Sequence, residues 1–142
     1  MYCSITNIEK KRIPTDTLIQ LTDDDDRGFV DSRIVNGCIS DATVLIDAYL
    51  RGRYAVPLDP IPDLATSICA DLAIYGLYCL RPSFDIPESV KDRRTTALAL
   101  LCRIQDGKMK LYEDAPAPPG ARSAVSISGP VRLFNRDGMG GF

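Results

Sequence analysis

The sequence predicts a mainly α protein: a small helical bundle of three longer helices and a short N-terminal helix, followed by an extended C-terminal arm. Three observations predict this class. Apolar residues recur every three or four positions over three segments, as they do on the buried face of a helix. Prolines stand at the boundaries of those segments and not inside them. After residue 112 this spacing stops and the chain becomes rich in Pro, Ala, Gly and Ser.

The first two expected helices are separated by an acidic turn. A short helix is predicted over residues 16–21, with Thr15 as its N-cap, and the acidic run 23–26 ends it. A longer helix is predicted over 31–53, with Asp31 as its N-cap. Its expected buried stripe consists of Ile34, Cys38, Ala42, Leu45, Ile46 and Tyr49.

A proline-rich corner follows that helix. The stretch "YAVPLDPIP", residues 54–62, cannot continue a helix because Pro57, Pro60 and Pro62 lack an amide donor and fix φ. We therefore expect a stiff corner that sets the angle between two core helices.

Two more helices complete the expected bundle. One is predicted over 62–80 and contains the most apolar stretch of the chain, residues 64–80. Its expected stripe is Leu64, Ile68, Leu72, Tyr75 and Cys79. The last helix begins at Pro87 and Glu88, and Gly107 is its expected C-terminal cap. Its expected inward residues are Val90, Ala97, Leu98, Leu101 and Ile104.

The chain is divided into a helical core domain, residues 1–112, and an extended arm, residues 113–142. The arm has room for a short β-hairpin, with one strand over 124–128. Its final segment, "VRLFNRDGMGGF", interleaves apolar residues with arginines but lacks the pattern to build a core, so it is expected either to dock on a partner as it orders or to be a flexible end. Aromatic residues and arginine dominate binding energy at interfaces, so the expected anchors are Leu133, Phe134, Arg136 and Phe142.

The composition argues against catalysis and against a bound metal or cofactor. The 142 residues include no histidine, which is the commonest general base near neutral pH and the commonest metal ligand. The five cysteines form no CxxC pair, and we expect them to be small core residues of a protein in a reducing cytosol. No glycine-rich phosphate loop is present. The acidic run fails as a calcium loop because Arg27 and Ile34 occupy ligand positions.

The charge is small overall but unevenly distributed. A net charge of −2 gives no general attraction to nucleic acid or to an anionic membrane. Residues 16–31 hold six aspartates against one arginine, whereas residues 88–110 hold six basic residues against three acidic ones. Acidic surface can stack on basic surface in an assembly, or both can be solvated faces. The start "MYCSITNIEKKR" lacks the apolar region of a signal peptide, and Asp71 interrupts the most apolar helix, so no membrane segment is expected.

Asp71 is the one charge expected deep in an apolar helix. A buried carboxylate needs a partner, and we expect Arg53 or Arg51 to supply it from the end of the preceding helix. Asp47 stands four residues before Arg51 and can pair with it. A catalytic Asp71 lacks a second titratable group at useful spacing. The predicted structural corner therefore consists of Asp47, Arg53, Tyr54, Pro57 and Asp71.

These residues resemble a known family: the small proteins encoded in the head–tail region of Mu-like phages and prophages. That family has an I-D-x-Y-L-x-x-R-Y-x-x-P-L block followed by a D-I-A-x-Y-x-L helix. The first block is matched here by Ile46, Asp47, Tyr49, Leu50, Arg53, Tyr54, Pro57 and Leu58. The second is matched by Asp71, Ala73, Tyr75 and Leu77, with Leu72 in place of the usual Ile.

The resemblance implies a structural protein of the virion, a head–tail connector or adaptor. Members of that class form a ring, usually of twelve copies, between the portal and the tail. The implied partners are further copies of the chain, the phage portal protein and a tail-side stopper or tail terminator protein. DNA would pass through the ring without specific binding. The implied location is the neck of the virion, after synthesis in the host cytoplasm.

The residue patterns are compatible with this role, and two alternatives stay open. In a ring, the acidic loop of Asp23, Asp24, Asp25 and Asp26 is expected to line the channel and repel DNA phosphates. One alternative is a tail-completion or stopper protein of the same virion. The other is a small helical DNA-binding regulator, which would use the basic residues of the last helix, Lys91, Arg93, Arg94 and Arg103.

Overall fold

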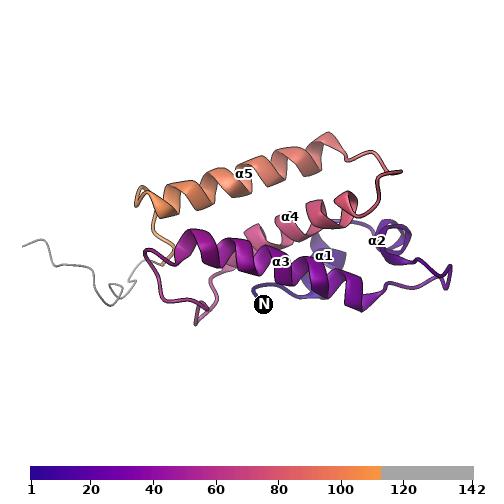
Figure 1. Ribbon diagram of the computed structural model, residues 1–142, viewed down its shortest axis with the longest axis horizontal. Helices are drawn as coiled ribbons and strands as arrows, with labels where there is room; N and C mark the ends of the chain where they lie inside the picture. The colour runs from indigo at the N-terminus through magenta and orange to yellow at the C-terminus, as the bar shows by residue number, and fades with distance from the viewer. Residues whose placement is uncertain (113–142) are drawn as a thin grey trace, which may run out of the picture.

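The structure of the protein is a computed structural model that describes residues 1–112 (Figure 1). This part of the chain forms five helices: α1 (Ile5–Lys11), α2 (Thr15–Thr22), α3 (Ser32–Leu50), α4 (Asp63–Cys79) and α5 (Glu88–Gln105). The predicted mainly α class is confirmed, and residues 1–112 contain no strand. The predicted arm, its β-hairpin and its anchors Leu133, Phe134, Arg136 and Phe142 lie outside the described residues.

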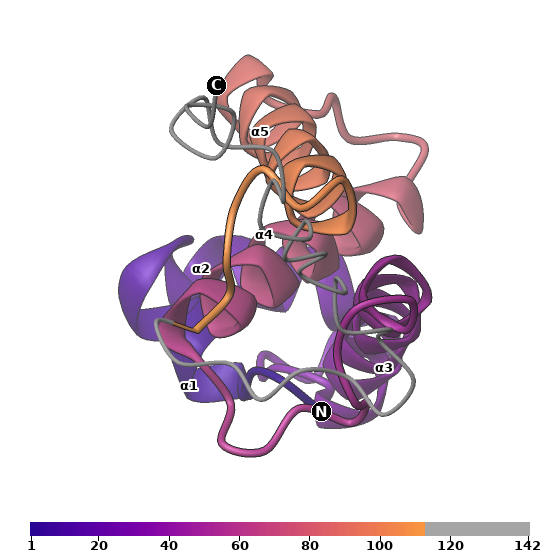
Figure 2. The same ribbon diagram turned by 90° about the vertical axis from the view of Figure 1, so that its left-hand side faces the viewer.

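Helix α4 is the centre of the bundle. In the end-on view of Figure 2 it lies between α5, α3 and the pair α1 and α2. Buried residues therefore occur nearly all around it, and three of them are alanines that let neighbouring helices approach closely. They are Ala65, Ile68, Cys69, Ala70, Leu72, Ala73, Ile74, Leu77 and Tyr78. The predicted buried face of this helix, a single stripe, was therefore narrower than the face that the structure buries.

Helix α3 is amphipathic, as predicted. Asp31 is its N-cap and accepts a hydrogen bond from the backbone N–H of Arg33 at 2.9 Å, as the sequence predicted. The buried stripe runs through Val35, Cys38, Ile39, Ala42, Ile46 and Leu50. The predicted Leu45 is wrong, because it lies on the outer face with 39% of its surface exposed.

Helix α5 follows its predicted pattern. Val90, Ala97, Leu101 and Ile104 are buried against α4 and α3. The helix ends where Gly107 adopts φ +76°, a left-handed conformation that glycine tolerates without strain.

The two short N-terminal helices depart from the prediction. Helix α1 was not predicted, because seven residues with few apolar positions give a weak periodic signal. Its Ile8 is completely buried, so packing against α3 and α4 stabilises it. Helix α2 begins at Thr15, and the extended Pro14 is its N-cap, so Thr15 was wrong as the capping residue.

The cysteines are only partly buried. Cys3, Cys38 and Cys69 are buried, as expected of small core residues. Cys79 and Cys102 are exposed, against the prediction, because Cys79 is the last residue of α4 and Cys102 faces outward on α5.

The helix connections gather at the two ends of the bundle. The α2–α3 connection, residues 23–31, and the α4–α5 connection, residues 80–87, lie at one end (Figure 1). The α3–α4 connection, residues 51–62, which contains the proline corner, and the residues that follow α5 up to 112 lie at the other end. No helix within residues 1–112 has the length and apolar character needed to cross a membrane.

Candidate functional site

Tyr2 holds the proline corner against the end of α3. Its side chain is buried, and its hydroxyl donates a hydrogen bond to the carboxylate of Asp47. The same oxygen accepts the backbone N–H of the buried Leu58 at 3.0 Å. Burial, with the bond to Asp47, raises the pKa of Tyr2 to about 12. Asp47 thus pairs with Tyr2 and not with Arg51 as predicted, since no Asp47–Arg51 ion pair occurs among residues 1–112.

Tyr54 joins the corner to the chain that leaves α5. Its hydroxyl accepts the backbone N–H of Leu111 at 2.9 Å. The ring of Tyr112 meets that of Tyr54 edge to face, with centroids 6.0 Å apart. Tyr112 in turn donates its hydroxyl to the carbonyl of Pro60 at 2.5 Å. The corner is therefore fixed by side-chain contacts as well as by its prolines, including Pro57, which follows a cis peptide bond.

Asp71 has an arginine partner, but not the predicted one. Nη1 of Arg12 lies 2.8 Å from Oδ1 of Asp71, and the Asp71 side chain is 14% exposed. Asp71 lies eight residues into α4, about 12 Å along the axis from the corner, which puts it beyond Arg53. The predicted pairing with Arg53 or Arg51 is wrong for this reason. Burial raises the pKa of Asp71, and the nearby guanidiniums of Arg12 and Arg93 oppose that shift.

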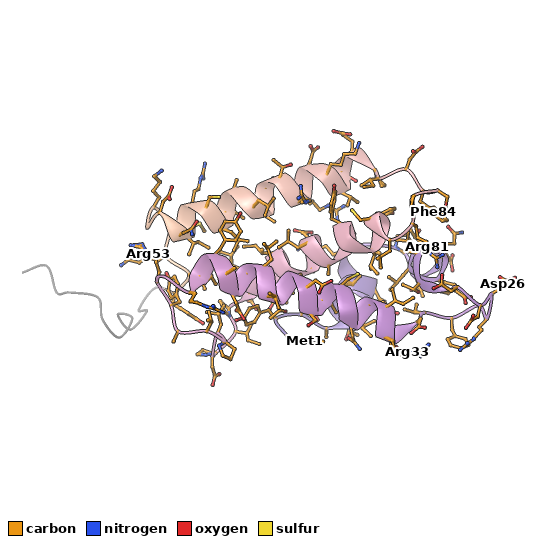
Figure 3. The ribbon with its side chains drawn as sticks, viewed as in Figure 1. Met1, Asp26, Arg33, Arg53, Arg81 and Phe84 are labelled. Carbon is orange, nitrogen blue, oxygen red and sulfur yellow. The ribbon has the colours of Figure 1, made fainter. Side chains whose placement is uncertain are left out.

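Arg53 lies at the end of α5 instead. Figure 3 shows it at the corner end of the bundle, far from the acidic loop. Its guanidinium lies over Gly107, so closely that a Cβ atom on Gly107 would stand only 2.1 Å from Nη1 of Arg53. A cation in this place is favourable because the C-terminus of a helix carries partial negative charge.

The acidic loop is a fixed turn. The carboxylate of Asp23 accepts the backbone N–H groups of Arg27 at 3.0 Å and Gly28 at 2.6 Å, and these bonds lower the pKa of Asp23. Asp25 forms an ion pair with Arg27. Asp26 occupies the tip with a left-handed φ of 54° (Figure 3).

Arg81 attaches this loop to the end of α4. Its guanidinium forms an ion pair with Asp24, and its Nε donates to the carbonyl of Leu21 at 3.1 Å. The two connections at this end of the bundle therefore form one surface. We call it the acidic end: six aspartates stand there against three arginines, namely Asp23, Asp24, Asp25, Asp26, Asp31 and Asp85 against Arg27, Arg33 and Arg81.

The acidic end also carries exposed apolar side chains. Phe29 and Leu80 are each 57% exposed, and Phe84 is 40% exposed (Figure 3 labels Phe84). Large apolar side chains gathered beside charges are typical of a surface that binds another protein.

The opposite end of the bundle has a small excess of cations, and we call it the basic end. Its cations are Arg51, Arg53, Arg103, Lys108 and Lys110, and its acids are Asp47, Asp59, Asp63 and Asp106. The uneven charge of the sequence thus becomes a separation of charge along the long axis of the described chain. Of the predicted site, the structure places Asp47, Arg53, Tyr54 and Pro57 at this basic end, whereas Asp71 lies apart from them along α4.

The side chains that hold these regions together were not predicted. They are Tyr2, Arg12, Arg81 and Tyr112, and each bonds to a residue at least 45 positions away in the chain. The sequence carries no local signal for such contacts. No cluster of three or more Cys, Asp or Glu side chains suited to a metal ion occurs within residues 1–112.

Comparison with known proteins identifies the family. Residues 2–128 match the family model described as "Bacteriophage Mu, Gp36". The chain is also 25% identical to "Gene product J" of Escherichia phage Mu over 115 residues, which are 80% of this chain and 79% of that protein. The matched region includes all five helices, the corner and the acidic end. The chain therefore belongs to the bacteriophage Mu Gp36 family.

Proposed function

We propose that this phage protein is a structural subunit of the virion, a head–tail connector that forms a ring between the portal and the tail. It acts through contacts and not through catalysis. Neighbouring subunits repeat one heterologous contact, in which the acidic end of one copy meets the basic end of the next. Such a contact closes into a ring when its rotation closes.

The separation of charge between the two ends carries the proposal. Six aspartates against three arginines at one end, and five cations against four acids at the other, give surfaces of opposite net charge on one molecule. The acidic loop is already fixed by Asp23, Arg27 and Arg81, so little conformational entropy is lost when it binds.

The exposed phenylalanines refine the role of the acidic loop. Phe29 and Phe84 stand beside the loop, and apolar side chains gain stability only when another surface covers them. A contact between subunits therefore explains this end better than the lining of an aqueous channel. In this proposal the acidic loop contacts a neighbour, with Phe29, Leu80 and Phe84 at the centre of the contact.

The basic residues of α5 do not favour the alternative of a DNA-binding regulator. The guanidinium of Arg94 lies over the ring of Tyr75, 4.4 Å from its centroid, and Lys91 pairs with Glu88 at 3.2 Å. Arg93 is half-buried beside Asp71. Side chains engaged within their own fold are poorly placed to follow a DNA backbone.

Deletion of the gene from the phage or prophage that carries it tests the role. We expect electron micrographs of the lysate to show full-sized heads and tails that are not joined. Supplying the unaltered protein from a plasmid should restore joined particles. Joined, infectious particles without the protein would refute the connector role.

A charge reversal tests the contact between subunits. Asp25→Lys should reduce the number of joined particles, and Lys110→Asp in the same chain should restore part of that loss, because the two charges attract again across the interface. Asp41→Lys is the matched control, since Asp41 is exposed on α3 away from both ends. Equal effects of Asp25→Lys and Asp41→Lys would contradict the proposed contact.

A further inference from the structure

Two buried thiols lie in contact between the N-terminal segment and α4. Sγ of Cys3 is 3.3 Å from Sγ of Cys69, although the two residues are 66 positions apart in the chain. Cys69 is completely buried and Cys3 is 9% exposed. The sulfur atoms need to approach by only about 1.3 Å to reach the length of a disulfide bond.

The surroundings fix the N-terminal segment in this position. The backbone N–H of Tyr2 donates to Oγ1 of Thr43 at 3.4 Å, and the hydroxyl of Tyr2 is bonded to Asp47. Cys3 is therefore held beside Cys69 both by the contact of its own thiol and by the hydrogen bonds of the neighbouring Tyr2.

We propose that Cys3 and Cys69 are a disulfide site, which forms when the protein leaves reducing surroundings and covalently pins the N-terminal segment to α4. If the protein is the virion component proposed above, lysis supplies this change, because particles assembled in a reducing cytosol are released into an oxidising medium. Neither Cys79 nor Cys102 takes part, since both are exposed and neither has a thiol partner among residues 1–112.

The electrostatics favour one thiol as the first to react. Cys3 donates its S–H to Sγ of Cys69, and this bond lowers the pKa of Cys69 and raises that of Cys3. Thiolates, and not thiols, are oxidised by peroxides. Cys69 is therefore the attacking sulfur.

The oxidant is a peroxide, and hydrogen peroxide serves as the probe. The Cys69 thiolate attacks one oxygen, the O–O bond breaks, and the second oxygen leaves as hydroxide, which takes up a proton to become water. The resulting Cys69 sulfenic acid reacts with Cys3: an S–S bond forms, and the hydroxyl leaves with the Cys3 proton as a second water. Two thiols are oxidised by two electrons, and one peroxide is reduced to two waters. Peroxide reaches Cys69 by brief local opening of residues 1–4, which precede the first helix. Oγ1 of Thr43, 3.8 Å from Sγ of Cys69, also lowers the pKa of Cys69 and stays in place during this opening.

The test uses the full chain with Cys79→Ser and Cys102→Ser, which removes the exposed thiols and leaves three. The protein is treated with stoichiometric hydrogen peroxide, unfolded in guanidinium, alkylated with N-ethylmaleimide and weighed. We expect one maleimide adduct after peroxide and three after reduction by dithiothreitol. Peptide mapping should show Cys3 and Cys69 in one cross-linked fragment. Because the disulfide closes a long loop, oxidation should raise Tm on the order of 10 °C.

Two further variants separate this pair from the remaining buried thiol. With Cys3→Ser added, peroxide should no longer lower the number of maleimide adducts. With Cys38→Ser added, peroxide should still lower that number by two. If Cys3→Ser does not fold, the peptide map of the parent chain decides the question alone. Separate alkylation of Cys3 and Cys69 after peroxide, or a link from Cys69 to Cys38, would overturn the proposal. The test uses isolated protein, so its outcome is independent of whether the chain joins heads to tails.

Discussion

The hydroxyl of Tyr2 stabilises the corner, and its removal tests that reasoning directly. In Tyr2→Phe the ring stays buried, but Asp47 loses a donor and the buried N–H of Leu58 loses its acceptor. A hydrogen bond to a charged group contributes about 1.5–3 kcal/mol, and an unpaired buried N–H costs about 1–3 kcal/mol. Both effects pass through one oxygen atom and overlap, so we expect a loss of about 3 kcal/mol.

Urea unfolding at pH 7 measures this loss. With an m value of about 1.5 kcal/mol per molar urea for a domain of this size, the midpoint should fall by about 2 M while m stays constant. Tyr78→Phe is the matched control, because Tyr78 is buried and its hydroxyl has no hydrogen-bond partner in residues 1–112. We expect that control to stay within about 0.5 kcal/mol of the parent.

The pH dependence supplies a second readout. The pKa of Tyr2 is about 12 in the folded protein, above its ordinary value near 10. A raised pKa means that the stabilisation is complete below pH 10 and is lost as the pH rises through about 12. The difference in stability between the parent and Tyr2→Phe should therefore narrow over that interval. If Tyr2→Phe unfolds with the same midpoint as Tyr78→Phe, the role of Tyr2 in the corner is refuted.

The other predictions concern an ion pair and a glycine. Arg12→Gln should cost about 1–2 kcal/mol in urea unfolding at pH 7, because Asp71 keeps its burial but loses its cation. Burial already raises the pKa of Asp71, so this cost should shrink as the pH is lowered and Asp71 protonates. Asp71→Asn in the same chain should remove most of the cost, and an unchanged cost in the double variant would contradict the coupling. Gly107→Ala should lower stability by about 1–2 kcal/mol, since φ is +76° and the new methyl group meets Arg53. Gly28 has nearly the same φ, but an added Cβ would meet no other atom there, so Gly28→Ala should lower stability less than Gly107→Ala. Equal losses of stability in the two variants would show that Arg53 moves aside without loss.

Much of the fold was predictable because local patterns specify it. Helices α3, α4 and α5 each present apolar residues at helical spacing with no proline inside them, and their ends lie within about three residues of the predicted ones. The N-cap Asp31 and the terminating Gly107 act through bonds and dihedrals within a few residues of themselves. Helix α1 escaped prediction because its stability comes from the burial of Ile8 and not from its own sequence.

The contacts at the candidate site were not predictable, because they join residues far apart in the chain and no local pattern specifies them. The need of Asp71 for a cation followed from its apolar neighbours, but the choice between Arg12 and Arg53 depends on how far α4 carries Asp71 from the corner. The rise of a helix gives the distance from the corner to Asp71. That Arg12 reaches Asp71 instead can be known only from how α1 packs against α4. Phe29, Leu80 and Phe84 likewise come to lie at one end of the bundle only because the α2–α3 and α4–α5 connections meet there.

By itself, the sequence determined the helical class, the proline corner, the uneven charge and the family to which the chain belongs. These properties depend on residue type and short spacing, which the chain carries whether or not it is folded. Only the tertiary structure decided that Arg12 pairs with Asp71, that Tyr2 holds the corner, that Cys3 meets Cys69 and that acidic and basic residues occupy opposite ends. Each of these joins groups far apart in sequence, and their distance in space is set by how α4 packs among its neighbours.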